Sequence, residues 1–182
     1  MTNTSNEIAV LGGGCFWCTE AVFLRLRGVT GVQSGYCGGH VNNPSYEQVC
    51  EKNTGHIEVV KVEFDLAQIS FDDILTVFFE THDPTTPDRQ GNDVGPQYAS
   101  AIFCQTAEQE EIARAHIQKS QARFSAPIVT KVLPAATFWP AEAYHDKFFE
   151  RNPNQPYCAF VVSEKVNKFM RHFPGQLKDP SQ

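Results

Sequence analysis

A cysteine stands between three glycines and two aromatic residues near the start of the chain, in Gly12-Gly13-Gly14-Cys15-Phe16-Trp17-Cys18. An apolar run over 8–11 precedes the glycines and apolar residues at helical spacing follow them, which predicts a strand that turns into a helix at Cys15. Glycine allows a tight turn and the close approach of another molecule there. Because a helix start carries unpaired N–H groups and partial positive charge, we expect the Cys15 thiol to ionise easily and to act as a nucleophile.

Glu58 is the second residue whose position suggests chemistry. The period of two in the expected strand 57–64 places Glu58 on the same face as Val60, Val62 and Phe64. Burial on that apolar face would raise the pKa of the carboxyl group and keep it protonated, so that it can donate a proton. The alternative is a Glu58 that lies at the wet end of the strand or pairs with a base.

The spacing of the cysteines leaves further functions open. Cys15 and Cys18 form a C-x-x-C pair, which is typical of a general dithiol–disulfide oxidoreductase. With Cys37 and His40 the same pair would also have the spacing of a zinc-held binding module. An apolar helix start disfavours zinc, so we expect no metal. Cys50 and Cys104 are interpreted as small apolar filling, and His145 as a helix-surface residue.

Composition limits the class of protein. A chain of 182 residues with 41% hydrophobic residues can bury a core, and we expect one domain over 7–175 between tails at 1–6 and 176–182. A net charge of -6 without a basic cluster argues against nucleic-acid binding. No run approaches the about 20 apolar residues of a membrane span, and no targeting signal is evident. We therefore expect a cytoplasmic protein with mostly reduced cysteines.

The expected elements mix strands and helices. We expect strands over 7–11, 29–36, 57–64, 100–105 and 129–133. We expect helices over 15–26, 46–51, 71–79, 106–124, 141–151 and 163–173, with Ser45 and Ser70 as caps. The segment 81–97 reads as a long functional loop. The segment 152–158 reads as a second loop, which its two prolines keep out of a helix.

Three separate motifs resemble the A-type peptide-methionine sulfoxide reductases. They are Gly14-Cys15-Phe16-Trp17, then Gly55-His56-Ile57-Glu58-Val59-Val60, then Glu80-Thr81-His82-Asp83-Pro84-Thr85 with the run from Asp88 to Tyr98. The likeness covers nearly the whole chain in family order. It implies an α+β fold, a two-layer sandwich with a ferredoxin-like plait core, a mixed sheet and long loops.

The resemblance also implies roles for individual residues. Cys15 matches the nucleophile and Glu58 the acid that protonates the sulfoxide oxygen. Tyr46 and Tyr98 match the hydroxyls that bind this oxygen. The remaining matches are in the substrate site: Phe16 and Trp17 form the apolar wall for the S-methyl group, and Asp93 is a site carboxylate.

A second cysteine must resolve the sulfenic acid that forms on the nucleophile. The segment 152–158 resembles the family's resolving segment, which points to Cys158. This chain departs from the commoner family pattern at Cys18, where many members carry a small residue. Cys18 is therefore the alternative resolving thiol. The resemblance further implies reduction of methionine (S)-sulfoxide, free or in proteins, recycling by thioredoxin, and no bound cofactor. We expect the protein to be a monomer.

Overall fold

Six strands form the main sheet of the computed structural model, which describes residues 5–179. The strands are β1 (Asn6–Gly13), β2 (Val29–Cys37), β3 (Ile57–Asp65), β6 (Ser100–Cys104), β7 (Lys131–Pro134) and β8 (Trp139–Pro140). Their order across the sheet is β7-β6-β1-β3-β2-β8. All neighbours are antiparallel except β6 and β7, which are parallel. The mixed sheet and its helices confirm the predicted α+β class.

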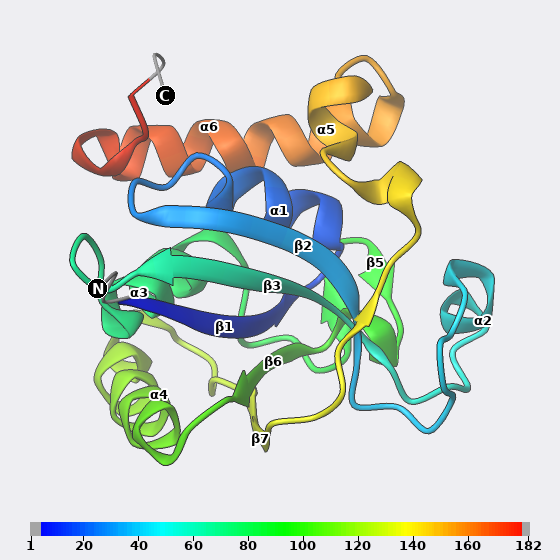
Figure 1. Cartoon of the computed structure of the whole chain (residues 1–182), viewed down its shortest axis with the longest axis horizontal. Helices are drawn as coiled ribbons and strands as arrows, with labels where there is room; N and C mark the ends of the chain where they lie inside the picture. The colour runs from blue at the N-terminus through cyan, green and yellow to red at the C-terminus, as the bar shows by residue number, and fades with distance from the viewer. Residues whose placement is uncertain (1–4, 180–182) are drawn as a thin grey trace.

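The helices pack against the sheet, and two of them lie in the C-terminal part of the chain. They are α1 (Phe16–Phe23), α2 (Tyr46–Cys50), α3 (Phe71–Thr81), α4 (Ala107–Ser120), α5 (Phe148–Arg151) and α6 (Ser163–His172). In Figure 1, α6 runs alongside α1, and the two helices are in contact. The predicted functional loop 81–97 contains a two-stranded ribbon of β4 (Arg89–Gln90) and β5 (Asp93–Val94). Among the described residues, no helix is long and apolar enough to cross a membrane.

Alternation along the central strands separates two apolar clusters. Val60, Val62 and Phe64 of β3 lie in the cluster that also contains the buried residues of α1 and α3. Ile57 and Val59 lie in a second cluster, against which Leu133 and Phe138 pack. A period of two produces this division, since successive side chains of a strand point to opposite faces. Glu58 therefore belongs to the helix-covered face of β3, as the sequence pattern predicted.

Two of the predicted caps form capping boxes that use the same chemistry. The Ser45 hydroxyl accepts the Gln48 N–H, and the Gln48 side chain accepts the Ser45 N–H. Ser70 and Asp73 form the equivalent pair at the start of α3. Each box satisfies N–H groups that the first helical turn leaves unpaired, and loss of one such cap typically costs about 1 kcal/mol. The Ser45 box fixes the short helix that begins with Tyr46.

The prediction of one continuous helix over 141–151 is wrong. The chain forms a single turn over Ala143–His145 and then the short helix α5. Lys147, between them, has a left-handed backbone with φ of 52°. The buried Glu20 carboxyl group of α1 lies near this point, where burial raises its pKa to about 7 and the backbone N–H groups of Lys147 and Phe148 lower it. A continuous helix has no place for a left-handed residue, so the segment divides here.

The predicted loop 152–158 is also shorter than expected. Pro156 is the first residue of a helical turn, and Cys158 begins a π-helical turn that runs directly into α6. Proline fits the first position of a helix because its missing N–H has no partner to lose there. Parts of the predicted tails, residues 1–4 and 180–182, lie outside the described residues. Within those tails Asn6 belongs to β1, and Leu177 pairs with Leu26.

Candidate active site

Cys15 lies at the turn between β1 and α1 and is the N-cap residue of α1. Gly14 before it has φ of 93°, and a Cβ there would come within 2.6 Å of the Gln90 side chain. Glycine is therefore required at this turn for both its backbone and its packing. Cys15 is partly exposed, whereas Phe16 is buried directly behind it. The predicted strand–turn–helix placement of the thiol is confirmed.

The Glu58 carboxyl group lies against the start of α1. Its Oε1 accepts the backbone N–H of Phe16 at 3.1 Å. The side chain is 1% exposed, and Oε2 has no hydrogen-bond partner among the described residues. Burial raises the pKa of Glu58 to about 8; the Phe16 N–H counteracts this only in part, and the charges of Asp93 and Cys18 add to it. The group is thus mostly protonated at neutral pH, with a free oxygen that can donate a proton.

The two thiols of the C-x-x-C pair lie within one helical turn, where the Cys18 N–H donates to the Cys15 carbonyl oxygen, and each affects the pKa of the other. Burial, and then the hydrogen bond to Cys18, raise the pKa of the Cys15 thiol well above its usual value. The hydrogen bond from Cys15 lowers the pKa of Cys18. The raised pKa of Cys15 contradicts the expectation that its thiol ionises easily. Burial outweighs the effect of the helix start on Cys15, and of the two thiols Cys18 is the one whose pKa is lowered.

Tyr46 and Tyr98 surround the same carboxyl group. Burial raises the pKa of both phenols, and the charge of Glu58 acts on each of them. Both hydroxyls therefore stay protonated and remain hydrogen-bond donors. The ring of Tyr46 also stacks on Phe16, with ring centres 6.4 Å apart and planes 24° from parallel. The structure thus gathers these three predicted residues around Glu58.

An aromatic wall continues from Phe16 to residues that the sequence patterns missed. Trp17 stacks on Phe148 with ring centres 3.8 Å apart, and its Nε1–H donates to His145 Nδ1 at 2.9 Å. His145 is fully buried and not on a helix surface, which corrects the prediction. Its Nε2 has no hydrogen-bond partner among the described residues. Burial lowers the pKa of His145, so the neutral ring presents Nε2–H as a donor.

Asp93 joins the site through Tyr157. The Tyr157 hydroxyl donates to Asp93 Oδ2 at 2.5 Å. The hydroxyl oxygen of Tyr157 also lies 3.9 Å from Cys18 Sγ. The charge of Asp93 also contributes to the raised pKa of Glu58. The predicted site carboxylate therefore lies near both the acid and the thiols. Tyr157 was missed because it stands in a segment without periodic pattern.

Cys158 is fully buried in a cluster with Cys18, Val162 and Val166, against which Cys15 packs. Burial raises the pKa of the Cys158 thiol, and the charge of Cys18 adds to this effect. All six cysteines are unpaired thiols. Both candidate resolving thiols thus lie near the nucleophile.

The zinc alternative finds no support in the geometry. Cys37 is buried in the cluster on the other face of the sheet, where its Sγ lies 3.7 Å from the Ala136 carbonyl oxygen. Within residues 5–179, no group of three or more His, Cys, Asp or Glu side chains is placed to hold a metal ion. Cys15 and Cys18 therefore form a thiol pair without the other two predicted ligands.

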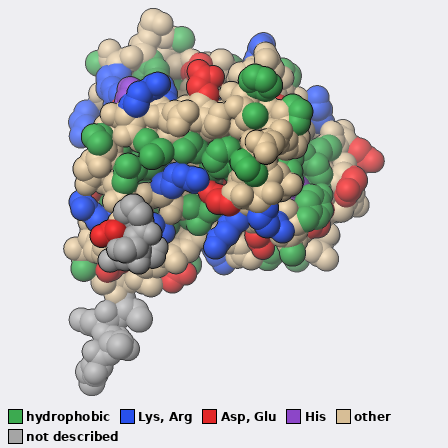
Figure 2. All heavy atoms as spheres, turned by 90° about the horizontal axis from the view of Figure 1, so that it is seen from above, with side chains coloured by type: hydrophobic (Ala, Val, Ile, Leu, Met, Phe, Trp, Pro, Cys, Tyr) green, Lys and Arg blue, Asp and Glu red, His purple; other side chains and the backbone are tan. Residues whose placement is uncertain are grey.

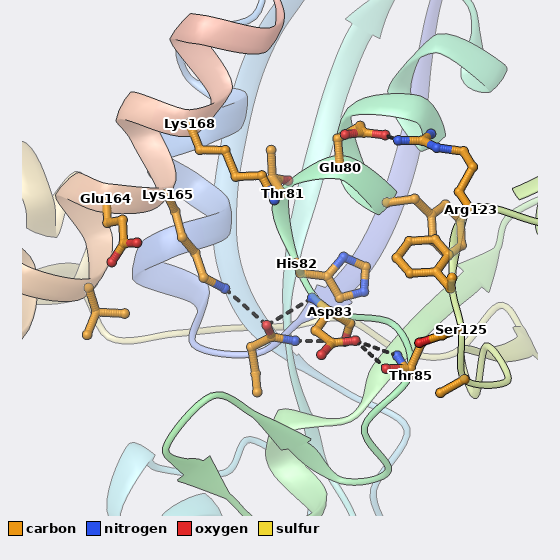
Figure 3. Close-up of a pocket in the computed structure, with 15 residues that line it drawn as sticks. Glu80, Thr81, His82, Asp83, Thr85, Arg123, Ser125, Glu164, Lys165 and Lys168 are labelled. Atoms are coloured by element: carbon orange, nitrogen blue, oxygen red, sulfur yellow. Dashed lines mark hydrogen bonds and ion pairs between the residues drawn. The ribbon is translucent and has the colours of Figure 1, made fainter. Parts of the chain in front are cut away.

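A cavity of about 640 Å³ lies elsewhere, between the end of α3, residues 123–126 and α6 (Figure 3). None of the predicted site residues lines it. The site around Cys15 instead combines a nucleophilic sulfur, a neutral carboxylic acid, phenolic donors and an aromatic wall. Such a set can attack an electrophilic atom that carries an apolar group and an oxygen in need of a proton.

Comparison with known proteins gives a consistent result. The model of the family described as peptide methionine sulfoxide reductase matches residues 7–177. Peptide methionine sulfoxide reductase MsrA of Ralstonia nicotianae is 55% identical over 178 residues, which cover 94% of this chain and 93% of that protein.

Solved structures agree. Methionine sulfoxide reductase A of Corynebacterium diphtheriae superposes with a TM-score of 0.80 at 32% identity, covering 85% of this chain and 78% of that one. Reduced Mxr1 from Saccharomyces cerevisiae gives 0.78 at 28% identity, covering 84% and 89%. A structure of Mxr1 in complex with Trx2 matches at 19% identity with a TM-score of 0.56, covering 80% and 86%.

Proposed function

Since the chain belongs to the peptide methionine sulfoxide reductase family, and so is an oxidoreductase that reduces methionine sulfoxide, we propose that Cys15 attacks the sulfoxide sulfur while Glu58 protonates the oxygen. The observation that carries this proposal is the Glu58 carboxyl group, held by the Phe16 N–H, with a raised pKa and a free oxygen. A sulfoxide oxygen leaves sulfur only after protonation, and a neutral acid supplies that proton.

The step conserves atoms and electrons. The Cys15 sulfur bonds to the sulfoxide sulfur while the proton of Glu58 passes to the oxygen. The sulfoxide S–O bond and the new S–S bond then break as the oxygen moves to Cys15, which leaves the thioether and a sulfenic acid. Methionine sulfur gains two electrons, which Cys15 sulfur loses. Tyr46 and Tyr98 donate hydrogen bonds to the oxygen while charge develops on it. Phe16 and Trp17 receive the S-methyl group, and Asp93 lies beside the pocket through Tyr157.

A second thiol then condenses with the sulfenic acid to form a disulfide and water. Cys158 and Cys18 are the candidates, because both lie in the cluster that Cys15 contacts. We propose thioredoxin as the reductant that restores the thiols by exchange. The resemblance implies this partner, and the structure of Mxr1 with Trx2 supports it.

The proposal also covers the core fold, the cellular location and the oligomeric state of the protein. The order β6-β1-β3-β2, with α1 and α3 as the crossing helices, supports a ferredoxin-like plait as the core of one domain over 7–175. We propose that this domain acts as a cytoplasmic monomer and needs no bound cofactor.

The proposed chemistry and its stereochemistry can be tested together. Reduced protein is mixed with the separate S and R epimers of an N-acetylated methionine sulfoxide amide, without reductant, and the thioether is quantified. We expect about one equivalent of thioether from the S epimer and a rate at least about a hundredfold lower from the R epimer. Insulin disulfide, supplied in parallel, should stay oxidised. Reduction of insulin without thioether formation would instead identify a general dithiol oxidoreductase.

A further inference from the structure

A lysine of α6 lies next to the thiol pair. Lys165 and Cys18 line one small void between α1 and the end of α3, together with His82. Lys165 also lines the larger cavity, and Figure 3 shows its side chain reaching from α6 towards His82 and Asp83. Its Nζ lies 3.4 Å from Gln90 Oε1. The ammonium group is therefore directed inwards and not into free solvent.

Gln90 connects this lysine to the turn before the nucleophile. Its side chain accepts the Asp83 N–H at 2.9 Å and donates to the Asp83 carbonyl at 3.0 Å. Its Cβ packs so closely on Gly14 that no side chain fits there. Because Gln90 is held on both sides, the position of the Lys165 ammonium is defined relative to the start of α1.

The charged and titratable neighbours of Cys18 have opposing effects. The Cys15 thiol lowers the pKa of Cys18 most, and Lys165 and Tyr157 lower it further, whereas burial and Asp93 raise it. Glu58 and Cys158 also interact with Cys18, but the first is mostly protonated and the second is a buried thiol. Burial lowers the pKa of His82 to about 3, so this ring adds no charge. Lys165 is thus the cation acting on the thiol pair.

We propose that Cys18 acts twice, first as the base that takes the Cys15 proton during attack and then as the thiol that resolves the sulfenic acid, with Lys165 as the positioning residue that stabilises its negative charge. The inference rests on the proposed function. Cys18 lies one helical turn after Cys15: its N–H donates to the Cys15 carbonyl oxygen at 3.1 Å, and Cys15 packs against the cluster that contains Cys18, so the proton has a short path between the two thiols. Cys18 is favoured over Cys158 because it lies in the first turn of α1, whose N-cap is Cys15, whereas Cys158 lies in the separate turn before α6.

The two steps balance. In the first, Cys15 gives its proton to the Cys18 thiolate, Glu58 gives its proton to the sulfoxide oxygen, and Cys15 becomes a sulfenic acid. In the second, the Cys18 sulfur bonds to the Cys15 sulfur and the S–O bond breaks. The hydroxide that leaves takes the proton from Cys18 and becomes water. Lys165 assists again, since Cys18 must lose this proton to attack.

Lys165→Met tests the role of the charge. Thioether formation in a single turnover, measured from pH 5 to 9, should keep its alkaline limb while its acid limb moves up by about one pH unit, so that the rate falls about tenfold below the limb. Thiolate absorbance near 240 nm should titrate at correspondingly higher pH. Lys165→Arg should restore both. Lys168→Met, which removes a cation from the same helix and cavity, is the matched control. A Lys165→Met profile that coincides with that of the wild type would overturn the role of the lysine.

Cys18→Ser tests the second role. This variant should form at most one equivalent of thioether, slowly, and then stop with a sulfenic acid on Cys15 that dimedone traps. In Cys158→Ser, peptide mapping should still find a disulfide between Cys15 and Cys18. Sustained turnover of Cys18→Ser with thioredoxin, through a disulfide to Cys158, would overturn the inference and leave the proposed function intact. A wild-type protein that yields no thioether would instead refute the proposed function.

Discussion

Replacing Cys15 by serine should abolish sulfoxide reduction. The serine hydroxyl fits the N-cap position and should leave the fold unchanged, but it ionises far too weakly to attack sulfur and cannot form a disulfide. The loss in rate should exceed about a thousandfold, which corresponds to at least about 4 kcal/mol of activation free energy. Single-turnover formation of thioether from the S epimer measures the effect directly, because it needs no reductant.

Cys104→Ser is the matched control for this variant. Cys104 is a buried thiol at the end of β6, in the cluster on the α1 side of the sheet, and the mechanism does not use it. Its replacement should leave the yield of thioether at one equivalent even if the melting temperature falls. Residual reduction by Cys15→Ser above about one per cent of the wild-type rate would contradict the assignment of Cys15 as the nucleophile.

Local sequence patterns were enough to predict the strand and the helix starts that position the site. The alternation around Glu58 placed the carboxyl group on the helix-covered face, and the structure confirms its burial. The serine caps at Ser45 and Ser70 were predictable because capping depends on residues only three positions apart. These features are local, so the sequence alone contains the information that determines them.

Features that depend on distant contacts were not predictable. His145 is buried because Trp17, far away in the chain, covers it and donates to its ring. The expected helix 141–151 divides at Lys147, which has a left-handed backbone and lies near the Glu20 carboxyl group of another helix. The raised pKa of Cys15 depends on burial and on Cys18, which the helix-start argument did not include. Each of these errors arose where a tertiary contact outweighed a local tendency.

Glu58→Gln should slow the chemical step steeply at neutral pH. The amide retains an oxygen that can accept the Phe16 N–H, so the start of α1 should stay in place. An amide, however, cannot protonate the departing oxygen, and loss of such an acid typically lowers rates by about 10²–10⁴-fold. Glu63→Gln, an exposed change on the same strand, is the matched control and should have no effect.

The pH profile distinguishes loss of the acid from a change in shape. Because the pKa of Glu58 is raised to about 8, its carboxyl group is protonated below that pH and loses its proton above it. The wild-type rate of thioether formation should therefore fall about tenfold for each pH unit above about 8. In Glu58→Gln this alkaline limb should disappear, because no group remains whose proton must be kept. A variant that is slow but keeps the limb would mean that another acid protonates the oxygen, and that Glu58 only shapes the pocket.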